Sequence, residues 1–343
     1  MDTLINHNHL KVCSHCILPA SFPGISFNSE GVCNYCQKFS GKEQKLQNDK
    51  KLYGQKFQDL LNQLDQSSQR SYDVLMAYSG GKDSTYTMHL LKEKYKLRVL
   101  AFSLDNGFIS EMSHKNIGEV VDRLGIDHIM FKPRWDILKK VFTYASRNEM
   151  YSKKTLERAS TICTSCIGLV KSLCLKTSIE QNIPMIGFGW SPGQAPVQSA
   201  IMRNNPSLIK MTQRAMMGPL EKVVGREIEP YFLNEWHYTQ SERFPYNVHP
   251  MAWEFYEENM ILEEIKKLGW KEPDDTDTNS SNCLLNAFAN EVHLDQFGFH
   301  PYVWEIANMV REGVMPRQMG YEKIYNEQRE ELIIPAKEKL GLQ

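Results

Sequence analysis

The sequence predicts a doubly wound α/β fold built on a parallel sheet, with an N-terminal zinc ribbon and a helical C-terminal region. Three observations carry this prediction. Short apolar runs alternate with helical patterns through the middle of the chain, which is typical of successive strand–helix–strand units. A glycine-rich turn joins the first apolar run to the first helical pattern. Two Cys-x-x-Cys pairs stand near the N-terminus.

Composition excludes several classes of protein. Of the 343 residues, 41% are hydrophobic and 24% are charged, as in an ordinary globular protein. The formal net charge of -1 removes any global electrostatic argument for nucleic-acid binding. No secretory signal and no stretch of about 18 apolar residues is evident, so we expect a cytoplasmic protein without membrane contact. Eight cysteines in such a chain favour metal-binding or catalytic thiols over disulfides.

The pattern along the chain indicates four parts. We expect a zinc-ribbon module at 1–45, a connecting helix at 46–72, a phosphate-loop α/β domain at 73–235 and a helical region at 236–343. Within the α/β domain the predicted strands are 73–78, 97–104, 126–131 and 184–188. The helices predicted in the same domain are 85–94, 114–124, 137–146 and 167–178.

The first cysteine pairs have the spacing of a zinc ribbon. They are separated by 16 residues, and each pair forms one knuckle around a tetrahedral ion. So short a module has too little apolar surface to fold without a metal. Four thiolates leave no open coordination position, so we expect a structural zinc ion held by Cys13, Cys16, Cys33 and Cys36.

The glycine-rich turn at 79–84 predicts a phosphate-binding loop. It stands between a predicted strand and a predicted helix, where backbone N–H groups and the helix dipole converge on an anion. The two glycines let the main chain approach the ligand, the lysine adds a full charge, and the serines donate hydroxyl hydrogen bonds. The expected phosphate ligands are Ser79, Gly80, Gly81, Lys82, Asp83 and Ser84.

The loop departs from the G-x-x-x-x-G-K-[ST] pattern that grips β and γ phosphates. It resembles the SGGxDS loop of the PP-loop ATP pyrophosphatase superfamily, whose members adenylate a substrate and release pyrophosphate. The resemblance implies an adenine nucleotide alpha hydrolase-like fold of the HUP type and ATP as the cosubstrate. It also implies that the segment around Asp105 lies beside the nucleotide, and that Asp83 or Asp105 helps to hold magnesium. The alternative is that Asp105 only caps the turn before Gly107.

Three further cysteines suggest a second centre. Cys163 and Cys166 form a third Cys-x-x-Cys pair just before a predicted helix, where helix N–H groups would lower a thiol pKa. If Cys283 joins them in space, the three thiolates suit an iron–sulfur cluster of the 4Fe-4S type with one iron left open. Buried cysteines, a second zinc site and a redox pair are the alternatives. Cys174, on an apolar helix, is expected in the core.

Two other segments are weaker candidates for substrate contact. The loop at 187–196 follows a predicted strand and is rich in glycine and proline, so it can approach a ligand closely or serve as a tight connection. Arg203, Lys210 and Arg214 lie near one helical face, where they could meet an acidic substrate, although a solvated helix face is the commoner outcome.

The order of the motifs resembles one family more closely. A Cys-x-x-Cys pair, FPGISFNSEGVCNYC, AYSGGKDS, CTSC and FGFHPYVWEIANMVREGVMPR follow one another as in the N-acetyl sugar amidotransferases of surface-polysaccharide (lipopolysaccharide) biosynthesis. The resemblance implies conversion of an acetamido group of a nucleotide sugar into an acetamidino group. ATP would adenylate the amide oxygen, and ammonia from a partner glutaminase would replace it.

Cys283 is unexpected in such an amidotransferase, because ammonia needs no thiolate. The phosphate loop equally resembles PP-loop sulfur transferases, which thiolate tRNA or small-molecule amides, some of them with a three-cysteine iron–sulfur centre. In that alternative Lys82, Asp83, Asp105 and the three cysteines form the catalytic site, and sulfide or a persulfide attacks the adenylate. The second alternative is a non-catalytic nucleotide- or RNA-binding scaffold.

Overall fold

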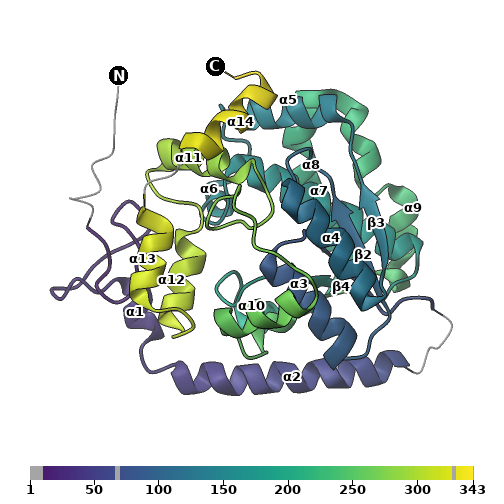
Figure 1. Ribbon diagram of the computed structural model, residues 1–343, viewed down its shortest axis with the longest axis horizontal. Helices are drawn as coiled ribbons and strands as arrows, with labels where there is room; N and C mark the ends of the chain where they lie inside the picture. The colour runs from purple at the N-terminus through teal and green to yellow at the C-terminus, as the bar shows by residue number, and fades with distance from the viewer. Residues whose placement is uncertain (1–10, 66–69, 327–329, 343) are drawn as a thin grey trace.

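The computed structural model describes residues 11–65, 70–326 and 330–342. It contains a six-stranded sheet in the order β3-β2-β1-β4-β6-β5, and the strands β2, β3 and β4 are labelled in the right half of Figure 1. All neighbouring strands are parallel except β5 and β6, which are antiparallel at one edge. The strands are β1 (Val74–Ala77), β2 (Val99–Leu104), β3 (Asp127–Phe131), β4 (Met185–Phe188), β5 (Ile201–Arg203) and β6 (Tyr246–Val248).

Helices surround this sheet and make up the C-terminal region. The α-helices are α1 (Asn34–Phe39), α2 (Glu43–Asp65), α3 (Lys82–His89), α4 (Glu111–Leu124), α5 (Trp135–Ala145), α6 (Lys153–Leu156), α7 (Thr161–Glu180), α8 (Pro206–Val224), α9 (Glu235–Thr239), α10 (Glu258–Lys267), α11 (Asn286–Phe297), α12 (Val303–Arg311), α13 (Arg317–Tyr325) and α14 (Glu330–Leu340). A π-helical turn, η2 (Leu90–Lys94), extends α3. Short 3₁₀ helices are η3 (Val197–Ser199), η4 (Gly225–Tyr231), η5 (Ser241–Arg243) and η6 (Pro250–Ala252).

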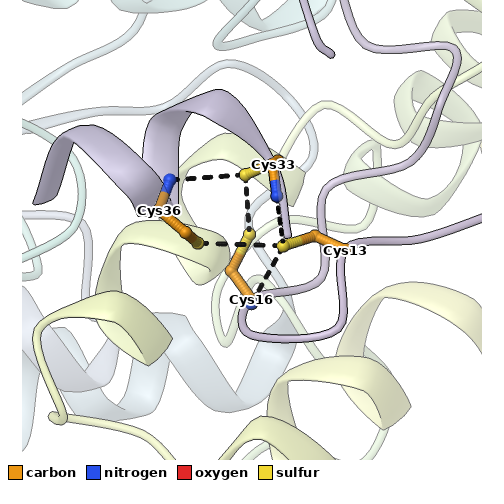
Figure 2. Close-up of side chains that lie close together, drawn as sticks. All are labelled: Cys13, Cys16, Cys33 and Cys36. Atoms are coloured by element: carbon orange, nitrogen blue, oxygen red, sulfur yellow. Dashed lines mark hydrogen bonds between the residues drawn. The ribbon is translucent and has the colours of Figure 1, made fainter. Parts of the chain in front are cut away.

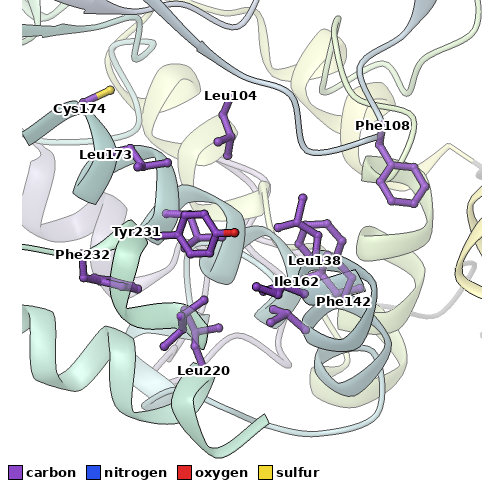
Figure 3. Close-up of a cluster of buried hydrophobic side chains, with 14 of the residues drawn as sticks. Leu104, Phe108, Leu138, Phe142, Ile162, Leu173, Cys174, Leu220, Tyr231 and Phe232 are labelled. Carbon is purple, nitrogen blue, oxygen red and sulfur yellow. The ribbon is translucent and has the colours of Figure 1, made fainter. Parts of the chain in front are cut away.

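Alternate residues of the central strands enter two separate apolar cores. In β1, Leu75 belongs to the core that contains α5, α7 and α11, part of which is drawn in Figure 3. Its neighbours Val74 and Met76 belong to the core formed with α3, α4 and α10. Because successive side chains of a strand point to opposite faces, this division shows helices packed on both faces of the sheet. The doubly wound fold class is therefore confirmed.

The strand order places a ligand site at the end of β1. The chain proceeds outward from β1 to β2 and β3, then returns to the other side of β1 with β4. This is the topological switch point of an open α/β sheet, where the carboxyl ends of neighbouring strands leave a crevice. The phosphate loop follows β1 directly, so the loop lies at this crevice.

All four strands predicted in the α/β domain are present, to within a few residues at their ends. The strands β5 and β6 were missed, because each has only three residues and takes its register from a neighbour. Since β6 pairs with β4, the chain beyond residue 235 contributes to the central sheet. The proposed domain boundaries stay a prediction.

Helix α7 is the apolar centre of one layer. By length and mean hydropathy it could cross a membrane, which qualifies the expectation that no such stretch exists. However, 61% of its apolar window is buried inside the protein, and it packs against β1, β2 and β4. The helix begins at Thr161, so Cys163 and Cys166 lie inside its first turns, where the sequence pattern had placed them before a helix. Cys174 is fully buried, as expected.

The N-terminal module packs against the C-terminal helices. Its four cysteines share a third apolar core with α12 and the second half of α13, and Figure 1 shows the purple and yellow segments side by side. Phe22 stacks on Trp304 with ring centroids 5.3 Å apart. Arg317 donates hydrogen bonds to the carbonyl oxygens of Cys13 and Cys16, each at 3.0 Å. The N-terminal module and the helices α12 and α13 therefore form one packed unit.

Candidate active site

The phosphate loop has the geometry of an anion cradle. Gly80 has a φ of +77°, and a Cβ there would lie 2.8 Å from Ile117, so only glycine fits this position. The hydroxyl oxygens of Ser79 and Ser84 lie 3.1 Å apart. Trp270 holds the loop from outside by donating its indole N–H to the Gly80 carbonyl at 2.9 Å. The backbone N–H groups that open α3 consequently face the crevice beside β1.

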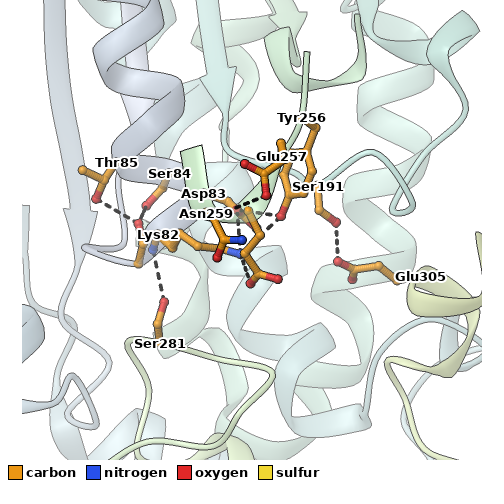
Figure 4. A network of polar contacts seen from close by, with 12 residues as sticks. Lys82, Asp83, Ser84, Thr85, Ser191, Tyr256, Glu257, Asn259, Ser281 and Glu305 are labelled. Carbon is orange, nitrogen blue, oxygen red and sulfur yellow. Dashed lines mark hydrogen bonds and ion pairs between the residues drawn. The ribbon is translucent and has the colours of Figure 1, made fainter. Parts of the chain in front are cut away.

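A neighbouring loop packs directly onto this cradle. The hydroxyl of Ser281 accepts a hydrogen bond from the backbone N–H of Lys82 at 3.1 Å, as drawn in Figure 4. In a nucleotide complex this oxygen position would suit a phosphate oxygen. Ser281 stands two residues before Cys283, so the segment that touches the phosphate loop also carries the third thiol.

Lys82 is held among acidic and phenolic groups. Its Nζ lies 2.5 Å from Glu258, 3.3 Å from the hydroxyl of Tyr256 and 3.7 Å from Asp83 (Figure 4). Burial opposes the charge, but the carboxylates raise the pKa of Lys82 above its ordinary value. Burial also raises the pKa of Asp83. Lys82 therefore stays protonated and is directed along the cavity that begins at the phosphate loop.

We call the cavity in front of the loop the phosphate cavity. Its volume is about 260 Å³, and its walls include Lys82, Asp83, Ser281 and Glu305. Glu305 comes from α12, and the Ser191 hydroxyl donates a hydrogen bond to its carboxylate (Figure 4). Sequence reasoning missed Glu305, although its place between apolar residues in the segment Val-Trp-Glu-Ile-Ala was a signal of a buried acid.

We expect Glu305 to make the stability of the protein depend on pH. Burial raises the pKa of Glu305 from 4.5 to about 7. The carboxyl group of Glu305 thus binds its proton more tightly in the folded state than in the unfolded state. The stabilisation from this proton is complete below pH 4.5 and is lost as the pH rises through 7. Relative to a Glu305→Gln variant, the wild type should lose about 2 to 3 kcal/mol of unfolding free energy between pH 5 and 8.

Urea denaturation at several pH values measures this difference. Glu322→Gln, a change at an exposed residue of α13, is the matched control and should follow the wild type. Parallel curves for the wild type and Glu305→Gln would contradict the expectation.

The three remaining candidate thiols line one cavity. Cys163, Cys166 and Cys283 all belong to the walls of a space of about 320 Å³, which we call the cysteine cavity. The Nδ2 atom of Asn106 lies 3.5 Å from the sulfur of Cys166 and 3.7 Å from that of Cys283. Asn286 approaches the sulfur of Cys163 at 4.0 Å. The structure therefore brings Cys283 to the same cavity as Cys163 and Cys166, which lie more than 100 residues earlier in the sequence.

The cysteine cavity adjoins the phosphate cavity. Ser79, Ser84 and Gly189 line both. Gly189 packs so closely on the phosphate loop that a Cβ there would lie 2.4 Å from the Cα atom of Ser84. Part of the candidate loop at 187–196 therefore does lie at the site, with Gly189 and Gln194 in both walls.

Burial controls the ionisation of these thiols. It raises the pKa of Cys163 and of Cys166 to about 12, so the helix terminus does not lower the thiol pKa as the sequence pattern predicted. The cause is the burial of the thiols in the cavity, which for Cys163 outweighs the side-chain hydrogen bond with Ser160 at the start of α7. Metal coordination would reverse this effect, because a coordinated thiol loses its proton.

The donor set fits an iron–sulfur cluster better than a single ion. Within the described part of the chain, the ribbon cysteines are the one group of three or more potential ligands whose atoms lie within 4.8 Å of one another. The sulfurs of Cys163, Cys166 and Cys283 therefore do not all lie within 4.8 Å of one another, whereas ligands of one small ion would, and ligands of separate irons lie farther apart. Three thiols and two asparagine amides line that space, and amide donors to sulfur are a usual feature of cluster sites.

Other predicted residues lie elsewhere. Asp105 accepts a hydrogen bond from the backbone N–H of Gly107 at 2.9 Å and pairs with Lys132 at 3.0 Å. It lines neither cavity, so its geometry is that of the turn cap, and its magnesium role stays a prediction. Lys210 pairs with Glu235, and Arg203 lies over the ring of Tyr246.

The four N-terminal cysteines form a compact cluster (Figure 2). All four sulfurs lie within 4.8 Å of one another, and the sulfurs of Cys13 and Cys36 are 3.8 Å apart, as are those of Cys16 and Cys33. A tetrahedral zinc ion with Zn–S bonds of about 2.3 Å requires sulfurs about 3.8 Å apart. The spacing of the four sulfurs thus fits the predicted zinc ion. Arg311 donates a hydrogen bond to the sulfur of Cys16 at 3.2 Å, and its positive charge offsets part of the negative charge of the thiolates.

Loss of this metal should weaken nucleotide binding at a distance. In a Cys33→Ser variant we expect no bound zinc and a loss of about 3 kcal/mol or more in stability, because a metal ligand is removed. The ribbon packs on α12, which carries Glu305 and Met309 to the phosphate cavity. ATP affinity should therefore fall roughly tenfold, the cost of about one misplaced polar contact.

Zinc analysis, thermal unfolding and ATP titration check this expectation. Ser14→Ala, a change in the other knuckle of the ribbon that removes no ligand, should match the wild type. Unchanged ATP affinity in a zinc-free but folded variant would show that the ribbon does not influence nucleotide binding.

Comparisons with known proteins find distant similarities to this chain. No family model matches it. It is 23% identical over 253 residues to an uncharacterized protein of Methanocaldococcus jannaschii, covering 74% of this chain and 72% of that protein. Among solved structures it is similar to the U34-tRNA thiolase NcsA of Methanococcus maripaludis, described with its 4Fe-4S cluster. That match has 18% identity, a TM-score of 0.36 and coverage of 89% of this chain and 88% of the other.

Another similar structure is the NMN synthetase of Francisella tularensis, at 12% identity and a TM-score of 0.38, covering 86% of this chain and 97% of that one. Both matches are distant, so the fold assignment rests on the strand order and the phosphate loop of the chain itself. Neither structure is a sugar amidotransferase, and that finer resemblance stays a prediction.

Proposed function

We propose that this protein is an ATP-dependent sulfur transferase of the PP-loop type. It adenylates a carbonyl-type oxygen of an acceptor and then replaces that oxygen with sulfur. The observation that carries the proposal is the meeting of Cys163, Cys166 and Cys283 in a cavity that shares walls with the phosphate cavity.

The phosphate cavity supports the first step. The acceptor oxygen attacks the α-phosphorus of ATP, the bond to the bridging oxygen breaks, and pyrophosphate leaves. Lys82 and the backbone N–H groups at the start of α3 face the negative charge that develops on the leaving group. Asp83, on the same cavity wall, is a candidate magnesium ligand together with phosphate oxygens.

The cysteine cavity supports the second step. A hydrosulfide ion attacks the activated carbon, AMP departs with the original oxygen, and no oxidant or reductant is needed. Cys163, Cys166 and Cys283 would hold a 4Fe-4S cluster, which supplies an iron with an open coordination position for the sulfur donor. Asn106 and Asn286 direct their amide groups toward the three sulfurs and fix their positions. The apolar wall limits competing hydrolysis of the adenylate by water.

Anaerobic purification followed by iron and labile-sulfide analysis tests this function. We expect about four irons per chain in addition to zinc. Labelled sulfide and labelled ammonia, each supplied with ATP and either bulk tRNA or a small-molecule extract, then show which element enters a product. Incorporation of sulfur with AMP formation supports the proposal, and a chain with zinc alone that incorporates nitrogen would overturn it.

The order of the sequence motifs favours a second candidate, N-acetyl sugar amidotransfer. The same adenylate would be attacked by ammonia from a partner glutaminase, with a nucleotide sugar as acceptor. Lys82, Asp83 and Glu305 would serve it equally well, because the first step is shared. This candidate leaves the three thiols around the cysteine cavity without a role, and we rank it second for that reason.

A further inference from the structure

A third cavity adjoins the cysteine cavity. It has a volume of about 340 Å³ and mainly apolar walls from β4, α7 and α8, with side chains such as Leu175 and Met216. Lys171, Phe188 and Trp190 line both this cavity and the cysteine cavity. We call the third cavity the lysine pocket. Its size and lining match those of small-molecule sites in general.

Lys171 brings a positive charge into this pocket without a counter-charge. Its Nζ lies over the ring of Trp190, 4.6 Å from the centroid. Within the described ranges no carboxylate pairs with it, although the residue is exposed. Lys176, also on α7, instead donates to the Pro230 carbonyl at 2.9 Å. An accessible ammonium group that lies against an aromatic ring and lines an apolar cavity is a site for an anionic group of a ligand.

A stack of rings makes one wall of the pocket rigid. His249 lies on Trp190 with ring centroids 4.0 Å apart and an angle of 14° between the planes, and Phe188 follows at 5.4 Å from His249. Burial lowers the pKa of His249 to about 3, so its ring is neutral near pH 7 and adds no second cation. His249 is therefore a packing residue, and Lys171 alone supplies charge among the lining residues.

We propose that the lysine pocket binds the acceptor of the sulfur-transfer reaction, and that this acceptor is a small aromatic or heteroaromatic molecule with one anionic group. The inference rests on the proposed function for the reaction itself. The anionic group pairs with Lys171, and the flat body packs on the apolar wall. The reacting carbonyl then extends into the cysteine cavity, which adjoins the phosphate loop. A sugar nucleotide would bring two phosphate charges to a single cation and suits the pocket less well.

Two fluorescent probes test the chemistry of the pocket in the full-length, cluster-loaded protein. One is 8-anilinonaphthalene-1-sulfonate, an aromatic monoanion, and the other is N-phenyl-1-naphthylamine, its uncharged relative. Lys171→Met should lower the binding affinity for the sulfonate about tenfold, which is the contribution of one charge-assisted contact. The affinity for the neutral probe should change less than about twofold. Lys171→Arg should restore sulfonate binding, and Lys176→Met is the matched control from the same helix.

Three outcomes would overturn the inference. Sulfonate affinity unchanged in Lys171→Met would place the probe elsewhere, and an equal loss of both probes would mean that the pocket has only collapsed. If magnesium-ATP competes with the sulfonate, and Lys171→Met lowers the affinity for ATP by the same factor, the pocket is part of the nucleotide site. The assay needs no turnover, so its failure leaves sulfur transfer standing. Absence of iron and labile sulfide would instead remove the proposed function and leave the binding result intact.

Discussion

Replacement of Cys163 and Cys283 together by alanine should abolish sulfur transfer while leaving adenylation in place. We expect iron and labile sulfide to fall from about four per chain to near zero, since two of three thiolate ligands are lost. Transfer of sulfur should drop by more than about 100-fold, the usual order for loss of metal ligands or their supports. Acceptor-dependent exchange of pyrophosphate into ATP should change little, because Lys82 and Asp83 line the phosphate cavity and not the cysteine cavity.

Cys174→Ala is the matched control for this variant. Cys174 lies on the same helix α7 and is fully buried, but it does not line the cysteine cavity. Its removal should cost about 1 kcal/mol of stability through lost packing and leave the iron content unchanged. Loss of iron in Cys174→Ala, or retained iron in the double variant, would show that the three cysteines are not the ligands of the cluster.

The second large effect concerns Lys82. Lys82→Met should slow acceptor-dependent release of pyrophosphate by about 10² to 10³-fold, because one positive group aimed at the leaving group is lost. The iron and sulfide content should not change, since Lys82 does not line the cysteine cavity. Steady-state measurement of pyrophosphate with saturating ATP separates this loss of rate from weaker binding.

Lys94→Met provides the comparison for Lys82→Met. Lys94 lies at the end of η2, pairs with Glu254 at the surface and lines none of the three cavities. We expect normal pyrophosphate release from it. If the rate of pyrophosphate release in Lys82→Met falls by less than about threefold, the backbone N–H groups of the loop stabilise the leaving group without the lysine.

Much of the site was predictable because its signals are local in sequence. The phosphate loop follows a buried strand and opens a helix within a few residues, so 79–84 could be placed without knowledge of distant contacts. The paired spacing of Cys13, Cys16, Cys33 and Cys36 likewise specified a four-thiol cluster. The apolar runs of β1 to β4 predicted a sheet buried on both faces, which the two cores confirm.

Other features depend on contacts between distant parts of the chain. Cys283 reaches the cavity because an isolated bridge pairs it with Ile109, while Leu284 donates to the Phe108 carbonyl at 2.8 Å. Glu305 reaches the phosphate cavity because α12 packs on the N-terminal module. The strands β5 and β6 exist only through their neighbours in the sheet.

The sequence alone thus determined the phosphate loop, the ribbon cysteines and the α/β class, since strands, turns and metal knuckles are encoded by neighbouring residues. Tertiary structure decided which groups share a cavity. It brought Cys163, Cys166 and Cys283 to one cavity, placed Glu305 in the same cavity as Lys82, and left Lys171 on the wall of an apolar pocket without a paired carboxylate among the described residues. The physical reason is that packing of distant segments sets such distances and burial, and periodicity in the sequence does not record it.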